Sequence, residues 1–520
     1  MELNNLYNFK NPIKHFINID NVNFPHDIAN FSTSNLCWTV PINISIRKFD
    51  NTHRTLKMPN MLNFKRALLC YDTMPHFRTI KDVDPIHKRL SANIETGDFS
   101  TGEYDNQLEE DFERLSVYDN LIRLDIKDFY NRLYTHNLDF GGLQESFLTN
   151  LNAGRTAGLI LGNYLSLYFA EMYLGKVSLE IQSKIVESGI ECDFSYDFYF
   201  YCNEGDNESL VEIFENVLQD HELERNSKIE IWTYGSFNNY NMIARYWKKV
   251  MAHCNIRFKS DSENNKMYFV NQIVYRMSQL ADEKLRKTFV NNFFKTEYFK
   301  DLDLDKFQIK NYDYHQLCFI FKSSPEVLLY TINKFNNMSR FDKSKIEKFL
   351  TVRYMESLKH PYHEEQLYYY FALKTLGYDS TLNHASDDAI KSRNQLLISY
   401  YLKDDFFNSS QINTLKRFKD EKYWFQNYHL ILYVSDMRVN LNISIEEYLI
   451  PKKACDTPAR PQKATYLNFY ERNINSGIAL IKEICDVNDE VENYLDLKIH
   501  EAREAYESEC NDDEDIDFDI

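Results

Sequence analysis

Apolar and polar residues follow two different patterns along this chain, and the change occurs near residue 275. In the first part, short runs rich in aromatic and β-branched residues, typical of strands, stand between longer stretches with apolar residues at helical spacing. This mixture predicts an α+β unit. The expected strands are NLIRLDIKDFY (120–130), CDFSYDFYFYC (192–202, a strand or hairpin) and KIEIWTYGSF (228–237), and the expected helices are 159–189 and 207–224.

The second part has the pattern of a helical array. Amphipathic segments recur roughly every 20 residues between short Asn, Asp, Ser or Pro breaks, as antiparallel helix pairs would. They share no repeat consensus, so the pattern indicates an irregular helical-repeat (HEAT-like) domain. We place the domains at residues 1–270 and 271–504, and we expect the acidic end of the chain, 505–520, to be disordered.

Composition narrows the class of protein. The 520 residues include only 13 Gly and 11 Pro, which favours long helices over an all-β fold. The nine cysteines show no CxxC or zinc-site spacing, and neither a signal peptide nor an apolar run of membrane-spanning length is found. A cytoplasmic protein that does not act at a membrane is therefore expected. The net charge of −18 argues against a protein that grips a long nucleic-acid duplex.

Two acidic residues in the strand-like runs suggest chemistry. Asp125 lies at the end of the strand expected within the first run, a Gly-opened helix follows after a gap, and Asp197 lies in the aromatic run after that helix. A carboxylate among aromatic residues is costly unless it has a partner. Carboxylates brought together from separate strands are what two-metal phosphoryl transfer requires, and Mg²⁺ needs few protein ligands. Strand acid, helix and hairpin acid are in the order found in the palm of a nucleotide polymerase, although Asp125 alone could simply cap a turn.

Four segments carry a resemblance to a known family. They are LKMPNMLNFKRAL, IRLDIKDFYNRLYTH, GLILGNYLSLYFAEMYL and ELERNSKIEI, which together span roughly residues 50 to 235. They resemble the fingers segment and motifs A, B and D of the abortive-infection (Abi) phage-defence polymerases, a bacterial branch of the reverse-transcriptase group. A prophage-borne member is expected. The resemblance implies a reverse-transcriptase-like fingers-and-palm domain followed by the helical domain.

The resemblance also implies roles for individual residues. Asp125, the carbonyl of Ile126 and Asp197 would bind Mg²⁺ or Mn²⁺, and Lys228 would stand near the leaving pyrophosphate as a proton donor or charge stabiliser. The residues implied to contact the dNTP are Arg54 and Lys57 for the triphosphate, Asp128 beside it, Tyr130 as the gate against a 2′-hydroxyl, and Gly162 and Asn163 at the start of motif B. Structural roles are the alternative: a surface lysine for Lys228, a hydrogen-bonding residue for His136 and a helix start for Asn163.

The chain departs from the family pattern at two motifs. Tyr196 stands where the hairpin normally has its first acid, and Asp197 is the second. Three interpretations follow: a site that works with Asp125 and Asp197, which we favour, a site without activity, or a contribution from Asp193. A neutral phenol does not replace a carboxylate as a Mg²⁺ ligand. Motif B has Ile160 and Leu161 in place of Pro-Gln, which removes a polar contact near the template.

The main hypothesis is a phage-defence DNA polymerase. The resemblance implies template-independent, protein-primed synthesis from dNTPs, with the single-stranded DNA product attached to a tyrosine of the protein. Tyr7, in the polar N-terminal run, is the first candidate primer, and Tyr104 is the second. Large helical surfaces rich in Tyr and Phe suggest a homo-oligomer, a trimer or hexamer, in the bacterial cytoplasm. The rivals are a templated RNA-directed DNA polymerase and a non-catalytic scaffold that binds a phage or host partner.

Overall fold

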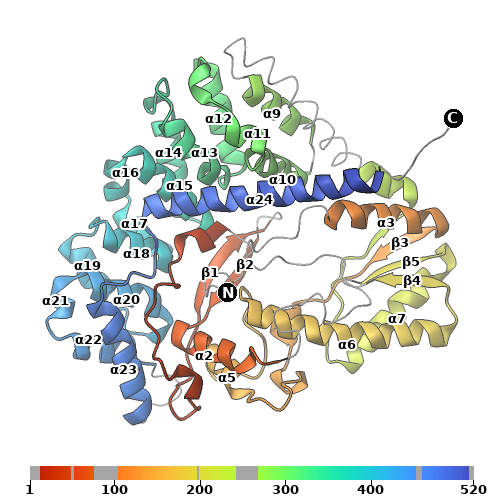
Figure 1. Ribbon diagram of the computed structural model, residues 1–520, viewed down its shortest axis with the longest axis horizontal. Coiled ribbons are helices and arrows are strands. Elements are labelled where there is room, and N and C mark those ends of the chain that lie inside the picture. Colours follow the sequence, from red (N-terminus) through yellow and green to blue (C-terminus); the bar gives the residue numbers. More distant parts are fainter. Residues whose placement is uncertain are drawn as a thin grey trace.

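The computed structural model describes residues 7, 12–48, 52–74, 103–195, 198–241, 268–280, 282–451 and 460–513. The described residues are mostly helical, with two small antiparallel sheets in the first half and helices as the regular elements from residue 268 onward. This agrees with the expected α+β unit followed by a helical part. In Figure 1 the helices form an arc around the strands, and the long helix α24 (Ile484–Asp513) crosses the front of the molecule.

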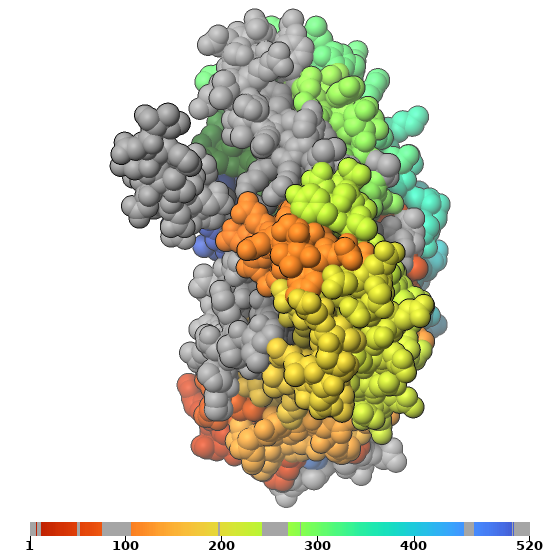
Figure 2. Space-filling model, turned by 90° about the vertical axis from the view of Figure 1, so that its right-hand side faces the viewer, coloured from red at the N-terminus to blue at the C-terminus, as the bar shows by residue number. Residues whose placement is uncertain are grey.

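The larger sheet has four strands in the order β4-β5-β3-β6, and every neighbouring pair is antiparallel. Side chains alternate between its two faces, as strand geometry requires. On one face Leu121 and Tyr201 pack against α3 (Glu103–Val117), and on the other Ile122 and Phe200 join the main core with α6 and α7. Figure 2 shows α3, in orange, beside the yellow α6 and α7 region. The strands are β3 (Asn120–Arg123), β4 (Cys192–Ser195), β5 (Tyr199–Cys202) and β6 (Glu230–Trp232).

Helix α6 (Tyr164–Ser188) is the longest element of the first half. It begins after Asn163, whose side-chain oxygen accepts the main-chain N–H of Ser166 at 2.8 Å. It ends at Gly189, which adopts the left-handed conformation at φ 70° that favours glycine after a helix. Its buried stripe includes Tyr168 and Phe169 and faces the sheet together with α7 (Asn207–Asp220). The helices predicted here are confirmed.

The smaller sheet is a hairpin of β1 (Ile42–Arg47) and β2 (His53–Met58), followed by α2 (Met61–Tyr71). The outer edge of β1 contacts the helical half of the chain. The main-chain N–H groups of Ser45 and Arg47 donate to His363 Nδ1 at 3.3 Å and to Glu364 Oε1 at 2.5 Å. Both acceptors lie on α15 (His363–Leu376), so this helix satisfies edge amides that a two-stranded sheet leaves unpaired.

The remaining helices belong to the second half of the chain. Adjacent helices pack along the arc, for example α13 on α15 and α18 on α20. The bounds are α9 (Tyr268–Gln279), α10 (Glu283–Phe294), α11 (Glu297–Asp301), α12 (Asn311–Ser323), α13 (Val327–Asn336), α14 (Ser344–Ser357), α16 (Asp379–His384), α17 (Ser386–Ser392), α18 (Gln395–Lys403), α19 (Ser409–Leu415), α20 (Trp424–Tyr433), α21 (Ser435–Arg438), α22 (Leu441–Tyr448) and α23 (Arg460–Asn475).

The two halves share one continuous hydrophobic core. The carbonyl of Phe16, near the N-terminus, accepts hydrogen bonds from the Tyr400 hydroxyl at 3.2 Å and from the Lys482 N–H at 3.1 Å. At the other end of the arc, α23 returns to α2, where the Asn60 amide donates to the Tyr470 hydroxyl at 2.7 Å. The N-terminal residues therefore pack with both halves, across the boundary expected at residue 270.

The C-terminal part differs from the expected disorder of residues 505–520. Helix α24 continues to Asp513, and residues 514–520 lie outside the described residues. Among the helices that the structure describes, none is both long enough and apolar enough to cross a membrane.

Candidate active site

Asp125 lies two residues beyond the end of β3, with its carboxylate exposed. Asn226 holds this segment from the side of β6: its main-chain N–H donates to the Asp125 carbonyl at 2.7 Å, and its side-chain amide donates to the Asp125 carboxylate at 3.1 Å. Asn226 belongs to the segment that was matched to motif D. The two segments that resemble motifs A and D thus lie side by side in the structure. Asn226 itself was not among the predicted site residues.

The hairpin β4–β5 lies on the other side of β3. Its described register with β3 runs from Asn120 opposite Cys202 to Arg123 opposite Tyr199, and the Leu124 N–H then donates to the Phe198 carbonyl at 3.1 Å. The turn residues Tyr196 and Asp197, the predicted acid among them, lie outside the described residues. The hairpin and the strand that ends just before Asp125 are thus antiparallel neighbours in one sheet.

Two non-glycine residues beside this site have left-handed backbone conformations. Asp128, predicted to lie beside the triphosphate, has φ 50°, and Phe198, directly after the hairpin turn, has φ 59°. Aspartate tolerates this conformation, whereas it is uncommon for a bulky side chain such as phenylalanine. Strained residues persist where the surrounding structure determines them, and they cluster at functional sites. The Asp128 side chain makes no capping hydrogen bond to α4 (Phe129–Arg132) and is exposed.

Asp193 takes no part in this site. Its carboxylate accepts from the Tyr118 hydroxyl at 3.4 Å and lies 3.9 Å from the Arg114 guanidinium, both on the side of the sheet that α3 covers. In the described register Asp193 stands opposite Tyr201, which stands opposite Leu121, so Asp193 lies level with a residue four positions before Asp125. The interpretation in which Asp193 supplies the missing acid is therefore wrong.

The residues around Asp125 fit a Mg²⁺ site in part. Lys127 N–H donates to the Glu224 carbonyl at 2.8 Å, so the Asp125 and Lys127 main-chain groups face motif D. In an antiparallel bridge the intervening residue then directs its own N–H and C=O to the opposite side, that of the hairpin. Ile126 is this residue, and its carbonyl accepts no main-chain hydrogen bond among the described residues. A carbonyl and a carboxylate are suitable Mg²⁺ ligands. No group of three acidic, His or Cys side chains forms a metal site within the described ranges, and Asp197 is outside them.

Tyr130 lies half-buried on α4, at the start of the loop that leads away from motif A. Its carbonyl accepts the Leu159 N–H at 2.7 Å, which ties motif A to the segment before α6. Burial raises the pKa of the Tyr130 phenol well above its usual value, the Glu171 carboxylate raises it further, and the Arg54 guanidinium opposes the shift. Arg54 and Tyr130, predicted separately as nucleotide contacts, are thus close enough to interact.

Lys57 lies near a cation that the motif comparison did not single out, Arg155. Burial lowers the pKa of Lys57, and the charge of Arg155 lowers it further. Neither side chain forms an ion pair with a carboxylate in the part of the chain that the structure describes, whereas the nearby Lys127 and Arg132 both pair with Glu224. Two mutually repelling cations without carboxylate partners are suited to an anion with several charges, such as a triphosphate.

Arg155 lies in loop 152–158, which reads NAGRTAG. Its only sequence signal is that it is the one charged residue in a patch of small residues. The Lys57 N–H donates to the Leu161 carbonyl at 2.7 Å, so strand β2 adjoins the segment that follows this loop. This contact explains why residues almost 100 positions apart place their charges together.

The predicted motif B contacts have different local roles. Gly162 has φ 111°, a conformation that favours glycine, just before α6. Asn163 uses its side chain within the turn: its oxygen caps Ser166, and its amide donates to the Ile160 carbonyl at 2.9 Å. The geometry of Asn163 is that of a helix cap. Gly162 allows the chain to turn from loop 152–158 into α6.

Lys228 and Tyr7 also have partners. The Lys228 ammonium, with 72% of its side chain exposed, pairs with Glu230. Tyr7 differs from its prediction as a residue on an accessible segment: it is fully buried, and its hydroxyl donates to the Pro59 carbonyl at 3.3 Å. Burial of the phenol is also the main cause of its strongly raised pKa. Tyr104, the second candidate, is the second residue of α3.

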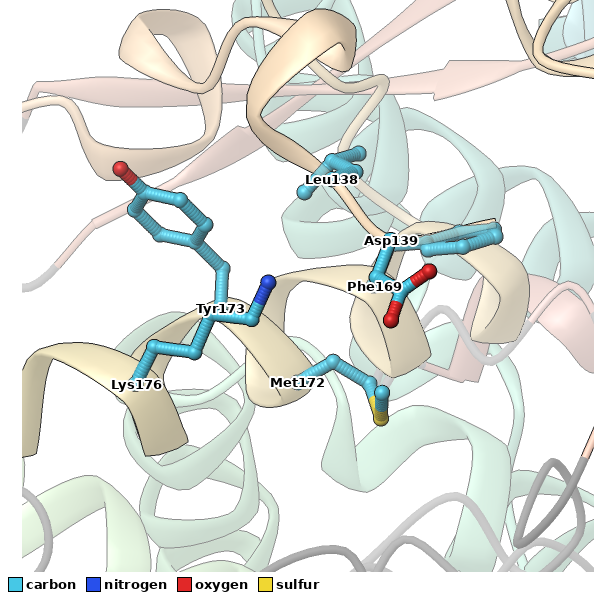
Figure 3. Close-up of a pocket in the computed structure, with 6 residues that line it drawn as sticks. All are labelled: Leu138, Asp139, Phe169, Met172, Tyr173 and Lys176. Atoms are coloured by element: carbon cyan, nitrogen blue, oxygen red, sulfur yellow. The ribbon is translucent and has the colours of Figure 1, made fainter. Parts of the chain in front are cut away.

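A pocket beside α6 lies apart from these residues. Its lining contains none of the predicted site residues, and in Figure 3 the Tyr173 hydroxyl points away from Asp139. That hydroxyl lies 2.9 Å from His221 Nδ1, and His221 Nε2 lies 2.9 Å from Glu180, so this chain fastens the end of α7 to α6. The pocket is lined by Leu138, Asp139, Phe169, Met172, Tyr173 and Lys176.

No model of a known protein family matches this chain, and no curated protein is found to be similar to it.

Proposed function

We propose that this protein is a nucleotidyltransferase of the reverse-transcriptase type that makes DNA from dNTPs in defence against phage. The observation that carries the proposal is the position of Asp125 between motif D and the hairpin. Phe198, which directly follows Asp197 in the sequence, accepts the Leu124 N–H next to Asp125, so we expect Asp125 and Asp197 to act as a pair. We expect this pair, with the Ile126 carbonyl, to hold the metal ions.

The chain's own residues supply most of the steps. Arg54, Lys57 and Arg155 would bind the triphosphate, and Tyr130 would lie against the sugar and exclude a 2′-hydroxyl. A hydroxyl oxygen then attacks the α-phosphorus and gives up its proton to water, a new P–O bond forms, and the bond from this phosphorus to the oxygen that bridges it to the β-phosphorus breaks, which releases pyrophosphate. Lys228 would neutralise the charge that develops on this leaving group after it leaves its half-buried partner Glu230. Mg²⁺ or Mn²⁺, when bound, supplies charge stabilisation at the attacking and leaving oxygens.

Protein priming and independence from a template are part of the proposal. They rest on the resemblance, on the loss of the polar motif B residue at Leu161 and on the net charge of −18, which disfavours a duplex-gripping cleft. The first hydroxyl would be that of a tyrosine, so the strand stays attached to the protein. A homo-oligomer, a trimer or hexamer, completes the proposed assembly.

The test uses the purified full-length protein with labelled dNTPs and Mg²⁺ or Mn²⁺, without template or primer. Denaturing gels before and after protease show whether label is attached to the protein. We expect label in the wild type and in Asp193→Asn, which changes an acid outside the site, and none in Asp125→Asn or Asp197→Asn. Label that appears only after addition of template–primer would favour the templated enzyme. Absence of label in every condition would leave the non-catalytic scaffold.

A further inference from the structure

Two exposed aromatic side chains flank loop 152–158. Trp38 has 46% of its surface exposed and Tyr134 has 41%. Trp38 lies against Gly154, and Tyr134 forms a β-bridge with Ala157, three residues farther along the loop. Arg155 lies between these two points of contact and is exposed. Large exposed aromatic residues grouped with a cation call for an explanation in a chain that buries most of its aromatic rings.

Trp38 is fixed in place by its neighbours on both sides. The Thr39 N–H donates to the Asn150 carbonyl at 2.9 Å, and the Ala153 N–H donates back to the Thr39 carbonyl at 2.9 Å. A Cβ atom on Gly154 would lie 2.3 to 2.5 Å from three atoms of the indole ring, almost equally far from each. That geometry places Gly154 over a face of the ring. Glycine is therefore required here for close packing, and 46% of the Trp38 surface stays exposed to solvent.

Tyr134 is held by the far end of the same loop. The Thr135 N–H donates to the Thr156 carbonyl at 2.9 Å, the Thr135 hydroxyl donates to the Glu145 carboxylate, and the Gly158 N–H donates to the Leu133 carbonyl at 2.9 Å. These bonds fix the backbone on both sides of Tyr134 while its ring stays exposed. The two rings are thus presented by an ordered loop.

We propose that Trp38, Tyr134 and Arg155 form a binding surface for single-stranded nucleic acid, with bases stacked on the two rings and the strand's backbone attracted by Arg155, whose charge it would share with the triphosphate of an incoming nucleotide. Aromatic side chains accept unpaired bases of any sequence, and nearby cations bind the phosphates. A duplex hides the faces of its bases and is not expected to bind. Because the net charge of the chain is −18, such binding depends on these local cations rather than on the overall charge.

The surface adjoins the proposed active site, so the proposal concerns the strand that enters or leaves it and in this respect rests on the proposed function. The Leu159 N–H donates to the Tyr130 carbonyl directly after the loop, and the Arg155 charge acts on Lys57. A strand on Trp38 and Tyr134 would therefore end near the residues that we expect to bind the incoming nucleotide.

The experiment measures fluorescence anisotropy of a labelled oligo(dT) about 12 nucleotides long, a length within the range of known single-strand sites. The protein is the full chain with Asp125→Asn, in EDTA and without dNTPs, so that binding is measured in the absence of synthesis. Oligo(rU) and a duplex of equal length are the two comparison probes. We expect the single strands to bind and the duplex to bind at least about tenfold more weakly; tighter binding of one single strand would identify DNA or RNA as the ligand.

Trp38→Ala should weaken binding about tenfold, and Tyr134→Ala and Arg155→Ala should do so to a smaller extent. Trp38→Phe keeps an aromatic face and should restore most of the affinity, whereas Gly154→Ala should weaken binding because it displaces the indole. Melting temperatures identify any variant that is merely unfolded. The proposal fails if Trp38→Ala and Tyr134→Ala bind oligo(dT) as the parent does, or if the duplex binds as tightly. Binding without any label incorporation in the polymerase assay would retain the surface and reject the proposed enzyme.

Discussion

Asn226 binds Asp125 twice, through a main-chain hydrogen bond of 2.7 Å to its carbonyl and a side-chain hydrogen bond of 3.1 Å to its carboxylate. The first bond aligns the segment before β6 with the segment that follows β3. The second bond engages only one of the two Asp125 carboxylate oxygens and so fixes the orientation of the carboxylate group. Asn226 thus acts on the proposed reaction through Asp125, as a positioning residue.

Asn226→Ala should lower kcat by about ten- to a hundredfold, the usual effect of losing a residue that orients a metal ligand. The main-chain bond remains, so the fold should persist and the melting temperature should change little. The signature of positioning is an increased Mn²⁺ concentration at half-maximal activity, together with partial rescue in Asn226→Gln. Equal kcat and Mn²⁺ dependence in Asn226→Ala and wild type would show that the amide has no such role.

Arg155→Ala should raise KM for dNTPs about tenfold with a smaller change in kcat. A charge-assisted hydrogen bond to phosphate contributes about 1.5–3 kcal/mol, and tenfold corresponds to about 1.4 kcal/mol. Lys57→Ala should have a similar effect, since both cations lack carboxylate partners among the described residues. Lys127→Ala is the matched control, because Lys127 is exposed and paired with Glu224. An unchanged KM in Arg155→Ala would remove it from the triphosphate site.

The titration of Glu364 should make the free energy of unfolding depend on pH. Burial raises the pKa of this carboxyl to about 8, although it accepts the Arg47 N–H, and Glu365 adds to the shift. The folded protein therefore holds a proton that the unfolded chain releases, so stability falls as pH rises toward 8. The buried His363 acts in the opposite sense. Burial lowers its pKa to about 4, so the unfolded chain binds a proton at this residue that the folded protein does not, and the free energy of unfolding falls as pH falls below about 6.5.

Between about pH 6.5 and 8 the Glu364 effect should therefore dominate. The free energy of unfolding of the wild type should fall by up to about 2 kcal/mol over this range, since a pH unit corresponds to about 1.4 kcal/mol for one proton. Glu364→Gln should show a flatter profile. The measurement is urea unfolding followed by circular dichroism at several pH values, with Glu365→Gln as the control. Parallel profiles for wild type and Glu364→Gln would contradict the assignment.

The elements of the first half could be predicted because their patterns are local. Alternation identifies β3 and the hairpin, and helical spacing identifies α6 and α7. Asn226 and Arg155 could not be chosen in this way, because their importance arises from contacts with Asp125 and Lys57 across the fold. Tyr7 stands in a polar run that predicts an accessible segment, yet its ring packs in the core, with its centroid 4.4 Å from that of the Phe64 ring and the two planes tilted by 42°.

The burial of Tyr7 argues against this residue as the priming tyrosine. A phenol that attacks a phosphorus must reach the site, whereas the Tyr7 hydroxyl is buried and bonded to the Pro59 carbonyl. We therefore expect Tyr7→Phe to keep protein-attached label and to lose about 1 kcal/mol of stability with the hydrogen bond.

Tyr104→Phe should abolish the attached label. Tyr118→Phe, which changes the residue directly after the C-terminal end of the same helix, α3, is the control and should retain the label. Protease digestion followed by mass spectrometry of the labelled peptide would identify the attachment site directly. Label that is lost in Tyr7→Phe and retained in Tyr104→Phe would overturn this assignment, and would mean that the Tyr7–Pro59 contact opens before the first nucleotide is joined.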